Sequence, residues 1–154
     1  MEEPISSVST PSPTARALLR GDPSHPQLIG EVLFSPYGRG TLVVARLLGL
    51  PKPGFLGFHI HEKGDCSTGG DVAFSGAGGH YDPHGVPHPW HAGDLPPILS
   101  LADGTALMAV YTDRFTPSDV IGRSVVVHDL PDDLHSQPAG NSGMRIACGL
   151  IEAT

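Results

Sequence analysis

Short apolar runs separated by Pro and Gly recur along the 154-residue chain, and apolar and polar positions alternate within several of them. The run at 27–34 is a clear case, because Leu28, Gly30, Val32 and Phe34 fall on alternate positions. Alternation with a period of two is typical of half-buried strands. We expect further strands at 14–20, 41–48, 55–62, 105–111, 120–128 and 144–151.

This pattern predicts an all-β fold. The runs are short, turn residues separate them, and no amphipathic helical period is found, which favours an antiparallel sandwich or barrel. Two segments, 63–97 and 131–143, have no period, and loops of such length are often functional. We expect one domain at 14–154, preceded by a polar, Pro-rich flexible tail at 1–13.

Histidines concentrate in the first of these aperiodic segments and in the strand before it. Six of the nine lie between Phe58 and Asp94. On a strand, His59 and His61 point to one face, while Phe58 and Ile60 point to the other. Two exposed histidines on a wet sheet face are one interpretation. The other is a metal site, because adjacent imidazoles reach one ion and imidazole suits both zinc and copper.

Composition restricts the partners. The formal net charge of -7, with no basic run, argues against nucleic acid as a partner. No stretch approaches the roughly 18 apolar residues of a membrane helix, so no membrane association is expected. No secretory leader is recognised, which predicts a cytoplasmic protein, or a periplasmic or extracellular one if a leader had been removed. Cys66 and Cys148 are either two buried thiols or a disulfide.

Five motifs in order carry a resemblance to a known family. They are G-F-H-I-H-E, G-G-H-Y-D-P, H-A-G-D-L, G-R-S-V-V-V-H and G-N-S-G-M-R-I-A-C-G. Together they closely resemble the copper–zinc superoxide dismutase family of bacterial type, over residues 15–151. The resemblance implies an eight-stranded Greek-key antiparallel sandwich or barrel with two long functional loops, a fold for which this family is a known example. It also implies an enzyme that converts the superoxide anion to dioxygen and hydrogen peroxide.

The resemblance also implies two joined metal sites. The residues that match the copper ligands are His59, His61, His80 and His128, and those that match the zinc ligands are His80, His88, His91 and Asp94. His80 would bridge the two ions. The loop before H-A-G-D is shorter here than the family pattern, so His84 competes with His88 as a zinc ligand. A variant that binds copper alone therefore remains an alternative.

Other residues match supporting roles in the family. Arg145 matches the arginine over the copper channel and, with His80, is expected to be catalytic. Asp132 matches the carboxylate that links copper and zinc histidines. Cys66 and Cys148 match the disulfide positions, which favours the bond over two thiols.

The rival functions are a copper-delivery module and a non-catalytic metal-binding module of the same fold. The chain has both the expected copper set and the channel arginine, which favours the enzyme. The sequence does not specify the oligomeric state, and a homodimer is one possibility.

Overall fold

A computed structural model of the chain describes residues 11–154. The expected tail at 1–13 lies mostly outside the described residues. The strands are β1 (Ala15–Gly21), β2 (Ile29–Tyr37), β3 (Gly40–Leu48), β4 (Gly54–Leu56), β5 (Phe58–His61), β6 (Ile98–Ser100), β7 (Ala106–Thr112), β8 (Ser124–His128) and β9 (Arg145–Ala153). A single helical turn, α1 (Pro117–Val120), and a 3₁₀ turn at Ser75–Ala77 complete the secondary structure of this part of the chain.

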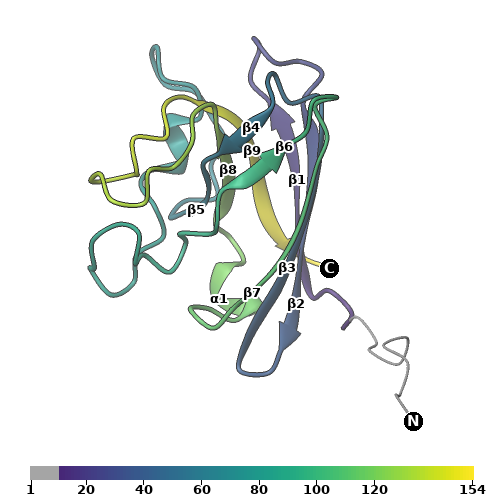
Figure 1. Ribbon diagram of the computed structural model, residues 1–154. Coiled ribbons are helices and arrows are strands. Elements are labelled where there is room, and N and C mark those ends of the chain that lie inside the picture. The colour runs from purple at the N-terminus through teal and green to yellow at the C-terminus, as the bar shows by residue number, and fades with distance from the viewer. Residues whose placement is uncertain (1–10) are drawn as a thin grey trace.

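The strands form one curled antiparallel sheet and a short second ladder. The large sheet has the order β5-β8-β9-β1-β2-β3-β7, and β4 pairs with β6. Figure 1 shows the large sheet curving so that β4 and β6 lie across its open side. The all-β antiparallel fold expected from the sequence is confirmed. None of the described helices is long and apolar enough to cross a membrane.

The expected strand at 55–62 is divided at Gly57, where the chain passes from one ladder to the other. Before this residue β4 pairs with β6, and after it β5 pairs with β8. A side chain at Gly57 would have its Cβ 2.6 Å from Oγ of Ser142, so only glycine fits the crossing. The residue is held by hydrogen bonds to the segment after β8, with its N–H donating to the Leu130 carbonyl at 2.9 Å.

The start of β8 differs from the sequence-based expectation more than any other strand boundary, and β6 lies outside the expected strands. A strand was expected at 120–128, but β8 begins only at Ser124. The preceding residues end α1 and form a turn. Pro117 at the first helical position suits a helix start, and the N–H of Thr116 donates to Oδ2 of Asp119 at 2.8 Å, which satisfies a free N–H at that start. Local capping therefore shortens the strand.

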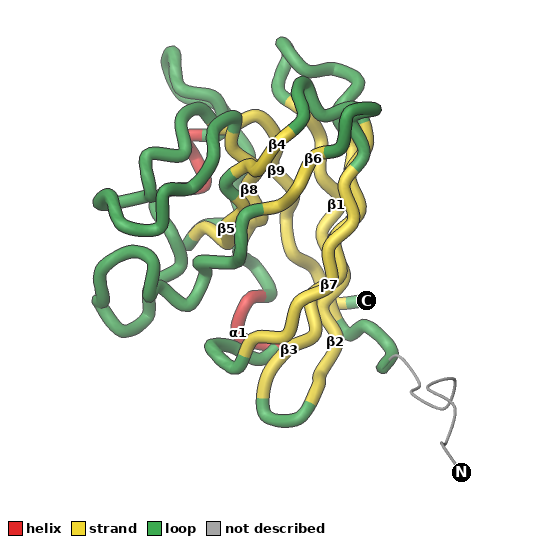
Figure 2. The backbone as a smooth tube through the Cα atoms, in the orientation of Figure 1, coloured by secondary structure: helices red, strands yellow, loops and turns green. Residues whose placement is uncertain are grey.

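The hydrophobic core lies inside the curled sheet. Inward residues such as Leu19, Phe34, Val43 and Ile60 are at most 1 % exposed. β1 shows strict alternation of buried and exposed positions, as its apolar period predicts. The two long loops gather on the side of the barrel that carries β5 and β8, away from β1, β2 and β3 (Figure 2). They therefore cover the outward face of β5.

Candidate metal centre

Four histidines meet on the outward face of β5 and β8. His59 and His61 come from β5, His128 is the last residue of β8, and His80 comes from the first long loop. One ring nitrogen from each lies within 4.8 Å of the others. The pairing of β5 with β8 places Phe58 opposite Val127, which brings His128 beside the two β5 histidines. We call these four residues the first cluster.

The free edge of β5 forms hydrogen bonds with the first long loop and so holds that loop against the site. The N–H of Tyr81 donates to the Ile60 carbonyl at 2.8 Å, and the N–H of Ile60 donates to the Gly93 carbonyl at 2.9 Å. An edge strand presents unpaired backbone groups, and here two loop segments satisfy them. Because His80 and Asp94 flank these bonded residues, both are placed against β5.

A second group of ligating side chains shares His80 with the first. It consists of His80, His88, His91 and Asp94, whose ligand atoms again lie within 4.8 Å of one another. Nδ1 of His80 is 2.7 Å from Oδ1 of Asp94 and 3.2 Å from Nδ1 of His91. We call this group the second cluster. His80 turns Nδ1 toward the second cluster and Nε2 toward the first, so its ring joins the two.

Asp132, from the second long loop, holds one ring of each cluster. Its Oδ2 is 2.7 Å from Nε2 of His59, and its Oδ1 is 2.8 Å from Nε2 of His88. The side chain is 1 % exposed. Burial alone would raise the pKa of Asp132, but hydrogen bonds from His59, Leu134 and His88 hold it well below its usual range. A carboxylate here makes both rings donate from Nε2, which leaves Nδ1 of each ring as an acceptor.

Backbone carbonyls orient two more rings. Nδ1 of His61 donates to the Gly78 carbonyl at 2.9 Å, and Nδ1 of His128 lies 3.5 Å from the carbonyl oxygen of Gly143. In each ring the other nitrogen, Nε2, faces the cluster. Such contacts to the remote nitrogen are the usual way in which proteins set the tautomer of a metal-binding histidine.

The fit of metal ions to these clusters rests on ring nitrogens without partners. Within residues 11–154, five buried ring nitrogens have no hydrogen-bond partner, namely Nδ1 of His59 and His88 and Nε2 of His61, His80 and His128. Nδ1 of His88 lies 3.0 Å from Oδ2 of Asp94 but makes no hydrogen bond with it. Leaving buried polar atoms unpaired is costly, and these five converge. Metal coordination satisfies all of them at once, so the residues fit two metal ions.

Burial keeps His61, His80 and His128 of the first cluster neutral and therefore able to coordinate. It lowers the pKa of His80 to about 4 and that of His128 to about 3, with neighbouring histidines adding to the shift at His128. Burial likewise holds the pKa of His61 well below its ordinary value. A metal-binding imidazole must be unprotonated. These shifts therefore preorganise the histidines near neutral pH.

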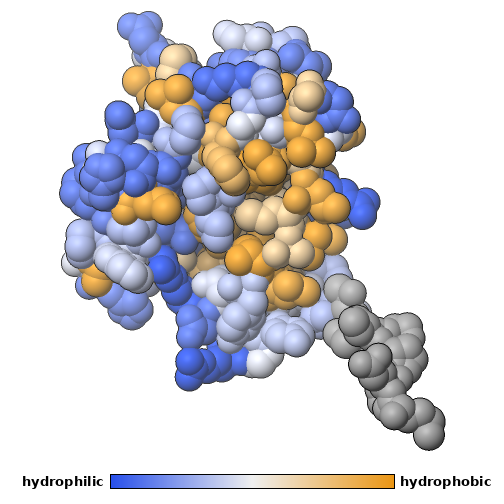
Figure 3. All heavy atoms as spheres, viewed as in Figure 1, coloured by the Kyte–Doolittle hydropathy of each residue, from blue (hydrophilic) through white to orange (hydrophobic). Residues whose placement is uncertain are grey.

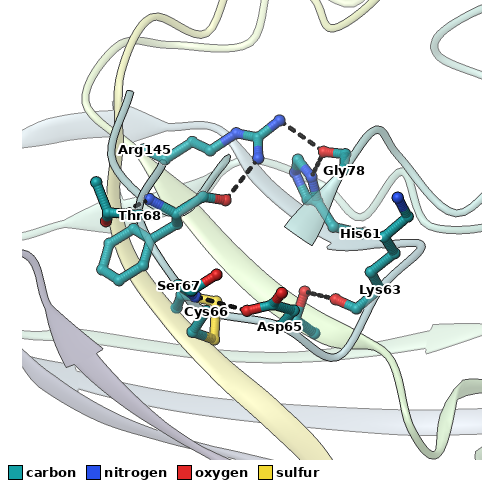
Figure 4. The surroundings of a disulfide bond; sticks show 11 residues. His61, Lys63, Asp65, Cys66, Ser67, Thr68, Gly78 and Arg145 are labelled. Carbon is teal, nitrogen blue, oxygen red and sulfur yellow. Dashed lines mark hydrogen bonds between the residues drawn. A yellow bond between two sulfur atoms is a disulfide. The ribbon is translucent and has the colours of Figure 1, made fainter. Parts of the chain in front are cut away.

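Arg145 stands beside the first cluster at the start of β9. Its guanidinium donates to the carbonyl of Phe74 at 2.8 Å and to that of Gly78 at 2.6 Å. The Gly78 carbonyl also accepts the bond from His61, so the arginine and a cluster histidine share one oxygen (Figure 4). Burial lowers the pKa of Arg145, but arginine remains charged in proteins.

Cys66 and Cys148 form a disulfide, with a Cα–Cα distance of 5.7 Å. The sequence-based expectation of this bond is confirmed. It ties the first long loop to β9, the strand that begins with Arg145. The loop whose Phe74 and Gly78 carbonyls accept from Arg145 is thereby attached to the barrel. Figure 4 shows Cys66 and Gly78 of this loop near Arg145.

The two competing loop histidines lie in different surroundings. His88 is 2 % exposed and belongs to the second cluster. His84 is exposed and belongs to neither cluster. Gln137 of the second loop holds the backbone of His88 on both sides: its Oε1 accepts from the His88 N–H at 2.9 Å, and its Nε2 donates to the His88 carbonyl at 2.7 Å.

Besides Gln137, sequence reasoning missed two more residues that support the second cluster. Arg114 donates to the carbonyls of Pro89 and His91 at 2.9 and 3.0 Å, which pins the shortened loop. Gly140 has φ 70° and packs against Asp132, and a Cβ there would lie 2.6 Å from Nε2 of His88. Neither has a signal in the sequence, because each acts through contacts between distant segments.

Fold and side chains together define a β-barrel protein with two adjoining, histidine-rich sites for metal ions. The family model described as "Copper/zinc superoxide dismutase (SODC)" matches residues 28–151. A Cu-Zn superoxide dismutase of Deinococcus radiodurans is 40% identical over 158 residues, which cover 92% of this chain and 85% of that protein. Superoxide dismutase [Cu-Zn] 2 of Aquifex aeolicus is 35% identical, with 81% and 80% covered.

Solved structures agree with this assignment. The Cu/Zn superoxide dismutase from Brucella abortus superposes with a TM-score of 0.79 at 30% identity, covering 90% of this chain and 99% of that one. The clock protein EA4 gives the same TM-score at 29% identity, covering 96% and 99%. The chain therefore belongs to the copper/zinc superoxide dismutase family. Membership implies copper and zinc as cofactors and superoxide as substrate, and the two clusters fit metal ions.

Proposed function

We propose that this chain dismutates superoxide with copper in the first cluster and zinc in the second. The observation that carries this assignment is the set of unpartnered ring nitrogens. Copper would be held by Nδ1 of His59 and by Nε2 of His61, His80 and His128, all of which lack another partner. Four imidazoles suit copper, which when bound supplies the one-electron redox chemistry that zinc does not.

Zinc would be held by the second cluster. Nδ1 of His80, His88 and His91 with a carboxylate oxygen of Asp94 make a three-nitrogen, one-oxygen set, which is typical of a closed tetrahedral zinc site. His88 is preferred to His84 because its free Nδ1 is buried among the other ligands. The complete second cluster argues against a protein that binds copper alone.

Three residues of the chain have separate tasks in the reaction. Nε2 of His80 is the atom that takes up a proton and passes it to the product. Asp94, which would share the zinc ion with Nδ1 of the same ring, would keep that ring in place. Arg145 attracts the superoxide anion and holds the carbonyl that orients His61. The copper-delivery alternative is not favoured, because the first cluster is complete and Arg145 stands beside it.

The test measures metal content and superoxide consumption on the same samples. The protein loaded with copper and zinc is expected to bind one of each and to consume superoxide. His128→Ala should lose copper and activity but keep zinc, whereas His91→Ala should lose zinc first. His84→Ala is the matched control, since it removes an exposed histidine outside both clusters. Copper retained at full activity in His128→Ala, or zinc lost only in His84→Ala, would refute the assignment.

A further inference from the structure

Three of the four ligands of the second cluster come from one short piece of the first long loop, which we call the ligand segment. It runs from His88 to Asp94 and carries a ligating side chain at every third position. Two tight turns build it. The N–H of Trp90 donates to the Pro87 carbonyl at 2.8 Å, and the N–H of Asp94 donates to the His91 carbonyl at 3.1 Å. The positions of three ligands therefore depend on the shape of one short backbone.

Hydrogen bonds carry much of the order in this part of the molecule. On the face shown in Figure 3, the region that Figure 1 assigns to the two long loops is mostly hydrophilic, whereas apolar side chains gather over β1, β2 and β3. Trp90, within the ligand segment, is 65 % exposed. With less apolar surface to bury here, polar contacts to the backbone have to keep the ligand segment in shape.

Arg114, which follows β7, holds the carbonyls of the ligand segment. Its Nη1 donates to the carbonyls of Pro89 and His91 at 2.9 and 3.0 Å and lies 3.4 Å from the carbonyl oxygen of Asp94. The guanidinium carbon lies 5.5 Å from the centroid of the Trp90 ring, a cation–π contact that keeps the guanidinium against the segment. One side chain thus fixes the backbone at or between the ligating positions.

Gln137 of the second long loop holds the other end of the ligand segment. Its amide group bonds both the N–H and the carbonyl of His88, and its Nε2 also donates to the His135 carbonyl at 3.1 Å. Arg114 and Gln137 reach the segment from parts of the chain at least 20 positions away. The ligand segment is therefore held from outside at both ends.

The two clusters face a problem of metal selectivity. They share His80, and imidazoles make up most of both. Cu²⁺ binds most sets of nitrogen and oxygen donors more tightly than Zn²⁺, so donor type alone would place copper in both clusters. The preferred geometries differ, because Cu²⁺ favours a tetragonal arrangement and zinc a tetrahedral one. A cluster that is prevented from relaxing toward the tetragonal arrangement would therefore favour zinc.

We propose that Arg114 is a positioning residue that makes the second cluster selective for zinc over copper, with Gln137 in support. Because it holds the carbonyls of the ligand segment, Arg114 keeps His91 and Asp94 from moving to the positions that Cu²⁺ would require. Within residues 11–154 its side-chain hydrogen bonds go only to backbone oxygens, so it acts through the backbone and not on the metal. The inference rests on the proposed placement of zinc in the second cluster.

Competition between the two metals tests the proposal. Metal-free protein is equilibrated with enough Cu²⁺ for both clusters and enough Zn²⁺ for one, unbound metal is removed, and the bound metals are measured. The wild type is expected to retain equal amounts of copper and zinc. Arg114→Ala should retain more copper than zinc, because its affinity for zinc should fall about 10- to 100-fold while the relaxed segment still accepts Cu²⁺.

Two variants control this measurement. Arg114→Lys keeps a charge and N–H donors but loses the planar guanidinium, so its copper-to-zinc ratio should lie between those of the wild type and Arg114→Ala. Arg46→Ala removes an exposed arginine of β3 and should match the wild type. Gln137→Ala should shift the ratio in the same direction as Arg114→Ala, which keeps the proposal testable if Arg114→Ala does not fold.

Co²⁺ reports the geometry of the second cluster, because tetrahedral Co²⁺ absorbs visible light more strongly than Co²⁺ of higher coordination number. The measurement uses His128→Ala, in which the first cluster is incomplete. The absorption per bound Co²⁺ should be strong in this variant and weaker when Arg114→Ala is added. A purely structural role of Arg114 would lower the unfolding temperature without changing this spectrum.

Three outcomes would overturn the inference. Equal copper and zinc in Arg114→Ala and unchanged Co²⁺ absorption would refute it and leave the zinc assignment intact. Copper in both clusters of the wild type would refute both the inference and the zinc assignment. Loss of copper and zinc together from a folded Arg114→Ala would also refute it, because the residue would then support both clusters alike.

Discussion

Removal of the Arg145 charge should slow superoxide consumption without removing copper. The guanidinium and Nδ1 of His61 bond the same Gly78 oxygen, at 2.6 and 2.9 Å, so the charge lies within about 6 Å of the His61 ring. We take a similar distance, about 6 Å, for an anion that reaches the first cluster. Arg145→Ala removes this charge and also two hydrogen bonds to loop carbonyls. Arg145→Lys keeps the charge but not the planar pair of donors.

The size of the effect follows from Coulomb's law. A unit charge about 6 Å from an anion contributes about 0.7 kcal/mol at an effective dielectric constant of about 80 and about 2.8 kcal/mol at about 20. Each 1.4 kcal/mol corresponds to about a tenfold change in rate. Arg145→Ala should therefore slow the reaction about 3- to 100-fold. Arg145→Glu should slow it further, and Arg145→Lys should retain an intermediate rate.

Ionic strength separates attraction of the substrate from a purely structural effect. The Debye length falls from about 30 Å at 0.01 M salt to about 10 Å at 0.1 M. Added salt should slow the wild type and Arg145→Lys, and should affect Arg145→Ala less, because the screened interaction is already missing. The rate is measured at both salt concentrations, with copper content determined on each sample. Arg39→Ala, an equal charge change on an exposed residue paired with Asp113, is the control and should keep the wild-type slope.

Equal salt slopes for the wild type and Arg145→Ala would refute the role in attraction. Arg145 would then act only through its bonds to Phe74 and Gly78. A loss of copper in Arg145→Ala would point the same way, because it would mean that the shared carbonyl no longer orients His61.

Three further outcomes are expected. An Asn at position 132 cannot accept hydrogen bonds from both His59 and His88, so Asp132→Asn should lower the affinity for at least one metal about 10- to 100-fold. Full retention of both metals in metal analysis would contradict this. Replacing Cys66 and Cys148 by Ser opens a loop of 82 residues. In the chain-entropy model this should lower the free energy of unfolding, measured in urea, by about 4.5 kcal/mol. An unchanged urea midpoint would contradict this expectation. In the metal-free protein, His80 and His128 bind protons more readily in the unfolded chain than in the folded one, because burial lowers their pKa. The free energy of unfolding should therefore be highest above about pH 6.5 and fall toward pH 4. A free energy of unfolding that rises on acidification would contradict this.

The short apolar runs were enough to predict all strands except β6, because side-chain direction in a strand repeats locally every two residues. β1, β2 and β3 lie close to the expected ranges. The same local rule placed His59 and His61 on one face. It failed at residues 120–123, where a capped turn competes with a short apolar run.

Burial of the histidines was not predictable in this way. All four residues of β5 are buried, although alternation alone leaves His59 and His61 on a wet face. Two loops cover that face because β5 is an edge strand whose free N–H and C=O groups bond Gly93 and Tyr81. A loop without a period gives no sign of where it returns to the sheet.

The choice between two neighbouring histidines shows the limit most clearly. His84 and His88 lie in the same Pro- and Gly-rich loop, and the sequence gives both the same chemistry. Residues far away in the chain separate them, since Gln137 holds the backbone of His88 and Asp132 holds its ring. Such contacts join segments more than 40 positions apart and have no local pattern. The sequence alone determined which residues could bind metal, and only the tertiary structure decided which of them meet.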